Sequence, residues 1–251
     1  MIDGRAEQPT WQARVLERLE WRDLLQVAIA LHVAAFILIT LFISGDFNLD
    51  SVHLYMTYGQ EVMDGKIPYQ DFDIEYPPLA VPLFALPTLV THDILAYRAL
   101  FALEMIAFDL IGVVIGLWAL RRLAPGIGPW GVLLVQPLLL LAAGKSIVLE
   151  RFDIAPAVLT LAAIVLFSAR RSGWAWLVLG LATVMKIYPV VLAPLFLLFA
   201  YRREGIWKQL DNLGIFALGI AVPTLIITRG DLVPMQRFLV YHAARGLEIE
   251  S

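Results

Sequence analysis

The stretch LLQVAIALHVAAFILITLFI, residues 24–43, decides the fold class of this 251-residue chain. It contains no Asp, Glu, Lys or Arg, and a helix of about 20 apolar residues spans the roughly 30 Å hydrocarbon core of a bilayer. The preceding segment, residues 1–23, is too long and too charged for the n-region of a signal peptide, and no small-residue cleavage site follows Ile43. We therefore expect residues 24–43 to form a retained first membrane helix.

The chain as a whole is also apolar. It is 60% hydrophobic and 16% charged, against about 45–50% and 25% for soluble domains. We predict an all-α fold, a polytopic membrane helix bundle of about seven spans: residues 24–43, 94–120, 130–143, 154–169, 174–185, 189–201 and 210–228. Residues 77–90 are apolar but short and contain four prolines, so we interpret them as a re-entrant or interfacial helix.

Basic residues predict the orientation of these spans. If the spans alternate in direction, one face receives Arg5, Arg14, Arg18, Arg22, Lys208 and the Arg-Arg pairs at 121–122, 170–171 and 202–203. Lys and Arg concentrate on the cytoplasmic side of membrane proteins. We predict a multi-pass protein of the cell membrane with a cytoplasmic N-terminal segment (1–23), a membrane domain (24–251) and a first extracytoplasmic loop (44–76).

That first loop is unusually acidic. Residues 44–79 contain seven of the 22 acidic residues of the chain and a single base, Lys66. Acids that merely keep a loop solvated are one interpretation. The other is a site, because acids alternate with aromatic residues in YQDFDIEYPP, and because Leu49, Val52, His53 and Met56 could pack one face of a short helix that holds Asp50 partly desolvated, where a general base is useful.

Two further charged positions lie on the same predicted side. Lys186 interrupts a long apolar run, and it either has a function at membrane depth or extends its amine to the interface. Arg151 and Asp153 form a structural salt bridge at the start of the span 154–169, or Arg151 lies near an anionic headgroup. Glu104 and Asp109 fall within the span 94–120, and we expect one of them to have a structural partner, with Arg98 as a candidate.

Four short motifs occur in order along the chain: Asp50-x4-Tyr55 with GKIPY (65–69), EYPPL (75–79), ERFDIAPAVL (150–159) and GLATVMKIYPVVLAP (180–194). Together with HAARGLEIES at 242–251, they resemble the GT-C superfamily of membrane glycosyltransferases, and most closely the bacterial polyprenyl-phosphate-mannose-dependent mannosyltransferases. The resemblance covers most of residues 45–251. Members of this family are usually much longer, so we expect several C-terminal helices to be missing from an N-terminal fragment.

The resemblance implies transfer of a sugar, mannose, from a polyprenyl-phosphate donor to a lipid or glycan acceptor at an extracytoplasmic site. Its catalytic base corresponds to Asp50, with Asp46 as second choice. Cations would hold the donor phosphate and aromatic or polar side chains the sugar and acceptor. We assign the phosphate to Lys186, Arg151 and Arg245, and substrate contacts to Tyr55, Tyr69, Glu75, Tyr76, Asp153, Tyr188 and His242.

Two other functions stay open. Broken helices with charges at membrane depth also occur in secondary transporters or permeases, although the charges here fall in outer loops and no internal repeat is visible. A non-catalytic membrane assembly subunit is the other alternative. The net charge of −3 and the lack of a basic tract argue against a nucleic-acid partner, membrane lipids being the expected surroundings. We expect no metal and no cofactor, with the lipid-linked sugar phosphate acting as substrate.

Overall fold

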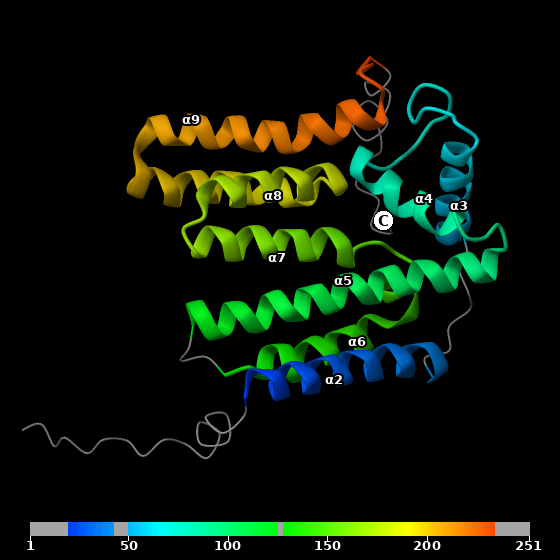
Figure 1. The fold of residues 1–251 in the computed structure, drawn as a ribbon, viewed down its shortest axis with the longest axis horizontal. Helices are drawn as coiled ribbons and strands as arrows, with labels where there is room; N and C mark the ends of the chain where they lie inside the picture. The colour runs from blue at the N-terminus through cyan, green and yellow to red at the C-terminus, as the bar shows by residue number, and fades with distance from the viewer. Residues whose placement is uncertain (1–19, 43–49, 125–127, 234–251) are drawn as a thin grey trace, which may run out of the picture.

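The structure is a computed structural model that describes residues 20–42, 50–124 and 128–233 (Figure 1). These residues form helices and no strand, apart from one isolated bridge between Pro68 and Phe72. In chain order the elements are α2 (Trp21–Phe42), α3 (Asp50–Met63), η1 (Pro78–Ala80), α4 (Val81–Thr88), α5 (Ile94–Leu123), η2 (Gly131–Val135), α6 (Gln136–Val148), α7 (Ile154–Ser168), α8 (Ser172–Met185), η3 (Tyr188–Leu192) and α9 (Ala193–Ile227).

The long helices lie side by side and form one bundle. Helix α2 packs against α5 and α6, α5 packs against α7, α7 against α8, and α8 against α9. The short helices α3 and α4 pack against each other at one end of this bundle, where α5 begins (Figure 1). The prediction of an all-α membrane helix bundle is confirmed.

Three described helices are long and apolar enough to cross a membrane: Trp21–Phe42, Ile94–Leu123 and Gly205–Ile227. The other apolar helices have 10–17 residues, and at 1.5 Å per residue even the longest of these covers less than the hydrocarbon core. The predicted segments 189–201 and 210–228 are joined in α9 by a break at Gly205, whose φ of 76° is left-handed. The count of seven spans stays a prediction.

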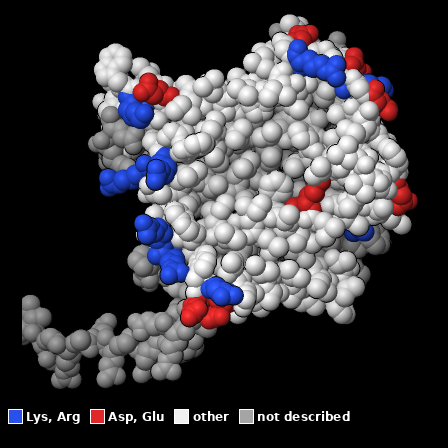
Figure 2. Space-filling view, viewed as in Figure 1, with Lys and Arg blue, Asp and Glu red and all other residues white. Residues whose placement is uncertain are grey.

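The two ends of the bundle differ in what they carry. Consecutive long helices alternate in direction, so Arg121, Arg122, Arg170 and Arg171 meet at the end opposite α3 and α4 (Figure 1). Figure 2 shows mostly basic side chains along that edge with acidic ones at its two corners, acidic and basic ones at the far end, and a broad face between them that is almost free of charge. We call the end with α3 and α4 the acidic end and the other the arginine end.

Helices α8 and α9 approach each other closely at two glycines. A Cβ atom added to Gly180 would lie 2.5 Å from the carbonyl oxygen of Phe216, and one added to Gly219 would lie 2.6 Å from that of Leu177. Small residues at such a crossing allow two backbones to pack where lipid provides no hydrophobic driving force. These glycines therefore hold Lys186, at the end of α8, in register with α9.

We predict that Gly180→Ala destabilises the bundle by about 1–3 kcal/mol, the usual cost of overpacking, partly offset by up to about 1 kcal/mol of helix propensity. Gly214→Ala is the matched control in α9, because a Cβ atom there meets nothing within 4 Å. Thermal unfolding of the purified variants in detergent measures both. Equal melting temperatures for the two variants would contradict the close α8–α9 contact.

Candidate functional site

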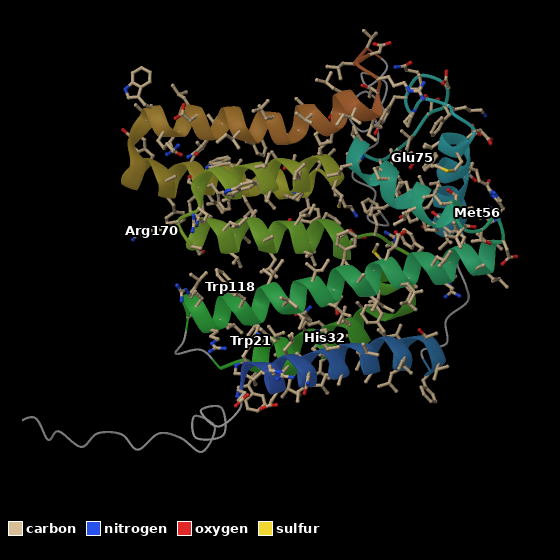
Figure 3. The ribbon with its side chains drawn as sticks, in the orientation of Figure 1. Trp21, His32, Met56, Glu75, Trp118 and Arg170 are labelled. Carbon is tan, nitrogen blue, oxygen red and sulfur yellow. The ribbon has the colours of Figure 1, made fainter. Side chains whose placement is uncertain are left out.

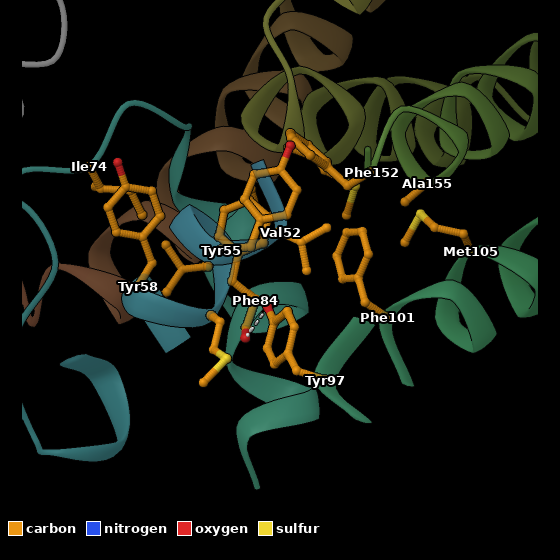
Figure 4. Packing of buried hydrophobic residues seen from close by; sticks show 14 of the residues in the cluster. Val52, Tyr55, Tyr58, Ile74, Phe84, Tyr97, Phe101, Met105, Phe152 and Ala155 are labelled. Atoms are coloured by element: carbon orange, nitrogen blue, oxygen red, sulfur yellow. Dashed lines mark hydrogen bonds between the residues drawn. The ribbon is translucent and has the colours of Figure 1, made fainter. Parts of the chain in front are cut away.

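An aromatic cluster fills the acidic end between α3, α4, α5 and the segment that precedes α7 (Figure 4). The ring of Tyr55 stacks on Phe84 with centroids 4.3 Å apart and planes 5° apart. Phe152 meets Tyr55, Tyr76 and Phe84 edge-on at 5.9, 5.2 and 5.4 Å. Such pairs contribute about 0.5–1.5 kcal/mol each beyond the area they bury, so this cluster fixes the loop after α3 onto the bundle.

Two of the tyrosines predicted to contact substrate belong to this core instead. Tyr55 is 2% exposed and Tyr69 is 3% exposed, and the Tyr69 hydroxyl donates to the backbone oxygen of Tyr76. Burial raises the pKa of both phenols well above the ordinary value, so they stay neutral. Because both rings are buried, neither can stack on a sugar in this structure. The aromatic spacing in the sequence therefore reflects packing of the loop.

Tyr76 lies closer to the charged groups of the site. It is half-buried, and its hydroxyl shares a hydrogen bond with that of Tyr55. Burial raises the pKa of Tyr76, while the charges of Arg151 and Asp153 act on it in opposite directions. The Tyr55–Tyr76 hydroxyl pair therefore faces the segment that carries these two charges.

Asp153 forms an ion pair with Lys186, which brings two of the predicted site residues together. Asp153 directly precedes α7, and Lys186 follows α8 in an extended conformation (φ −153°) that ends the helix. The side chains are 36% and 33% exposed, and the Lys186 Nζ atom also lies 5.1 Å from the centroid of the Phe152 ring. An ammonium has three donors, so this pairing leaves Lys186 able to bind a further anion.

Arg151 supplies a second cation beside this pair. Its side chain is half-buried, and it has no carboxylate partner among the described residues. Its positive charge acts on the phenols of Tyr55 and Tyr76, so the guanidinium lies within electrostatic range of them. A planar guanidinium in this position can bind a phosphate through two parallel hydrogen bonds.

A buried ion pair ties residues 150–153, the segment before α7, to α5. An Arg98 guanidinium nitrogen on α5 lies 2.9 Å from Glu150 Oε1, and the side chains are 16% and 3% exposed. Glu150 is the residue before Arg151, so this pair ties the chain that carries Arg151 and Asp153 to the first turns of α5.

Two pairings predicted from the sequence are therefore wrong. Asp153 pairs with Lys186 and does not form a salt bridge with Arg151. Arg98 pairs with Glu150 rather than with Glu104 or Asp109, and Asp109 instead accepts a hydrogen bond of 2.9 Å from the Gln136 side chain of α6. Glu150 and Arg98 could have been found as two opposite charges at predicted outer helix ends, but their pairing depends on the packing of α5.

Asp50 begins α3, and its side chain is exposed. The buried face of the helix contains Val52, Tyr55 and Met56, whereas His53, expected on that face, is exposed. The prediction that Asp50 is partly desolvated is therefore not met. Tyr55 lies five residues further on, about 7.5 Å along the helix axis, so Asp50 stands at the rim of the aromatic cluster.

The remaining predicted residues divide in two. Glu75 is partly exposed in the loop after α3 (labelled in Figure 3), and Tyr188 is 43% exposed, with its hydroxyl bonded to Thr160 of α7. Asp46, His242 and Arg245 lie outside the described residues. Among the described residues, no group of three or more His, Asp or Glu side chains could hold a metal ion.

Helices of membrane length and a cluster of cations, carboxylates and tyrosines at one end define a membrane protein with a polar site at the end of its bundle. The chain belongs to glycosyltransferase family 87, whose family model matches residues 74–244. The matched region contains Tyr76, Arg151, Asp153 and Lys186 but begins after Asp50. No curated protein and no solved structure matches the chain.

We predict that Arg98→Met destabilises the fold by about 3–5 kcal/mol, because it leaves the Glu150 carboxylate buried without its partner. The double variant Arg98→Met with Glu150→Met should recover most of this loss, since no charge then remains buried. Unfolding of the two variants and of wild type in detergent tests this. If the double variant is as unstable as Arg98→Met, the cost comes from lost packing and not from the unpaired charge.

Proposed function

We propose that the protein transfers mannose from a polyprenyl-phosphate donor to a lipid or glycan acceptor on the extracytoplasmic face of the membrane. Membership of glycosyltransferase family 87 supports sugar transfer and disfavours the transporter and assembly-subunit alternatives. The observation that carries the choice of donor is the placement of Arg151, before α7, and Lys186, after α8, at the same end of the bundle, where a lipid phosphate at the membrane surface could reach both.

The donor phosphate lies between Lys186 and Arg151 in this proposal. Lys186 donates to Asp153 and to the phosphate at once, and the ion pair with Asp153 directs the ammonium. As the bond between the anomeric carbon and the phosphate oxygen breaks, its electron pair passes to that oxygen, and both cations stabilise the developing charge. Arg245 is a further candidate for this phosphate.

The lipid tail needs an apolar surface next to the phosphate. Exposed apolar side chains follow Lys186 just before and within η3: Ile187 is 45% exposed, Val190 39% and Val191 67%. Because α8 ends at Met185 and α9 starts at Ala193, these side chains lie on a short 3-10 turn between two helices. We propose that the polyprenyl chain enters the bilayer along this turn.

The acceptor hydroxyl requires a base on the aqueous side. We keep Asp50 in this role, with Asp46 as the alternative, because an exposed carboxylate at the rim can take a proton from an acceptor that arrives from water. The hydroxyl oxygen then attacks the anomeric carbon from the side opposite the phosphate. Tyr76, Glu75, Tyr188 and His242 are the proposed contacts of sugar and acceptor.

We predict that Lys186→Met lowers kcat/KM for the polyprenyl-phosphate donor by about 10–100-fold, the value of one charge-assisted hydrogen bond. Lys66→Met is the matched control, since Lys66 is also a lysine of the acidic end but pairs with Glu61 on the surface. Transfer of labelled mannose in membranes measures both. Equal kcat/KM for Lys186→Met and wild type, at equal protein levels, would exclude the phosphate role.

We predict that Asp50→Asn lowers kcat by about 10²–10⁴-fold and leaves the donor KM unchanged, because the amide cannot accept the proton. Asp64→Asn should be close to silent, as Asp64 is an exposed residue in the turn after α3. The same assay decides between the candidates. Normal transfer by Asp50→Asn with loss in Asp46→Asn would assign the base to Asp46, and normal transfer in both would remove catalysis from this loop.

A further inference from the structure

A cavity of about 400 Å³ lies at the arginine end, far from the proposed active site. Among the described residues it is lined by Trp21 at the start of α2 and by Trp118, Arg121 and Arg122 in the last turns of α5. Figure 3 shows Trp21 and Trp118 together at this end, opposite Glu75. Its volume falls within the range of small-ligand pockets, and nothing in the glycosyl transfer uses it.

The chemistry of the lining suits an anion. The Arg121 guanidinium lies 5.7 Å from the centroid of the Trp21 ring, so a cation–π contact holds it between two helices. Neither Arg121 nor Arg122 has a carboxylate partner among the described residues. Two acids lie beside Trp21 in the sequence, Glu20 and Asp23, and the Asp23 carboxylate accepts a hydrogen bond from the backbone N–H of Glu20 at the start of α2.

An apolar stripe leads from this cavity along α5. Going back from Trp118 at spacings of four, three, four and four residues, the exposed side chains on this face are Trp118, Val114, Ile111, Ala107 and Leu103. Residues three and four apart share one face of a helix, and this face runs for about 22 Å. A soluble phosphate would need no such stripe, whereas an acyl chain below a headgroup would lie along it.

We propose that this cavity binds the headgroup phosphate of an anionic phospholipid, with Arg121 and Arg122 as its ligands and the α5 stripe as the contact for an acyl chain. Trp118, which is 44% exposed, lies at the boundary between the two parts, where an indole suits the membrane interface. The site is independent of the glycosyl transfer proposed above.

The experiment compares lipid binding by purified protein in neutral detergent, measured by native mass spectrometry. The probes are phosphatidylglycerol, phosphatidylcholine, glycerol phosphate and inorganic phosphate. Wild type should bind phosphatidylglycerol in preference to the other three. Arg121→Gln with Arg122→Gln should weaken that binding about 10–30-fold, as expected when two arginines at a membrane surface are lost.

The matched control is Arg170→Gln with Arg171→Gln, which removes the same charge from the same end of the bundle but from residues outside the cavity lining. It should change phosphatidylglycerol binding less than about twofold. Arg121→Lys with Arg122→Lys keeps the charge and should retain most of the binding, which separates loss of charge from failure to fold.

Three outcomes would overturn the proposal. Equal losses in the two Gln double variants would mean general attraction to a basic surface. Equal binding of phosphatidylcholine and phosphatidylglycerol would mean that the site does not select for the negative charge of the headgroup. Binding of glycerol phosphate or inorganic phosphate as tight as that of phosphatidylglycerol would make this a soluble-phosphate site without an acyl contact.

Discussion

The burial of one ring, Phe152, connects the core of the acidic end to its charged site. The ring is 1% exposed and meets Tyr55, Tyr76 and Phe84, so the backbone at this point has little freedom. Its two neighbours, Arg151 and Asp153, cannot enter the space that the ring occupies. The face of the same ring also receives the ammonium of Lys186, from a helix more than thirty positions later in the chain. A single aromatic anchor thus sets the backbone from which Arg151 and Asp153 project, and its ring contacts the ammonium of Lys186.

Charged side chains at the acidic end need partners, because they lie in or next to an apolar environment. A charge without a partner in an apolar environment is costly, and removing one member of a buried pair is worse than having neither. Glu150 and Arg98 form an ion pair in the interior, and Asp153 and Lys186 form one nearer the surface. Arg151 is different, because no described carboxylate pairs with it. An anionic substrate that binds beside Arg151 would supply the negative charge that no described carboxylate supplies to it.

Sequence reasoning recovered the helices better than the contacts between them. The starts of α5 at Ile94 and α7 at Ile154, and the ends of α8 at Met185 and α5 near Arg121, follow from apolar runs that stop at charges, which is a local signal. It also gathered Asp153, Arg151 and Lys186 on one side of the bundle, which the structure confirms. It could not tell that Asp153 pairs with Lys186, or that Tyr55 is core, because both facts depend on α7 and α8 lying side by side and on α3 packing over Phe84. Alternation of aromatic and acidic residues looks the same for a site and for a packed loop.

The way α8 ends explains why Lys186 can serve a site at all. Its backbone N–H still bonds to the carbonyl of Ala182, but its own φ and ψ are extended, and Pro189, which has no N–H, lies in the first turn of η3 and cannot continue α8. The side chain is thereby turned out of the helical register and toward α7, where Asp153 lies just before the first turn.

The Asp153 carboxylate also affects how tightly Lys186 can bind a second anion. Asp153 occupies one donor of the ammonium, so in the proposed site a phosphate would have only the remaining donors, and substrate and product phosphates alike would bind less tightly than to an unpaired lysine. Interactions that strengthen only as the leaving phosphate gains charge raise the rate, whereas tight binding of the ground state does not. In the proposed reaction, a lysine held by an aspartate would therefore release a spent lipid phosphate more readily than an unpaired lysine at the same position.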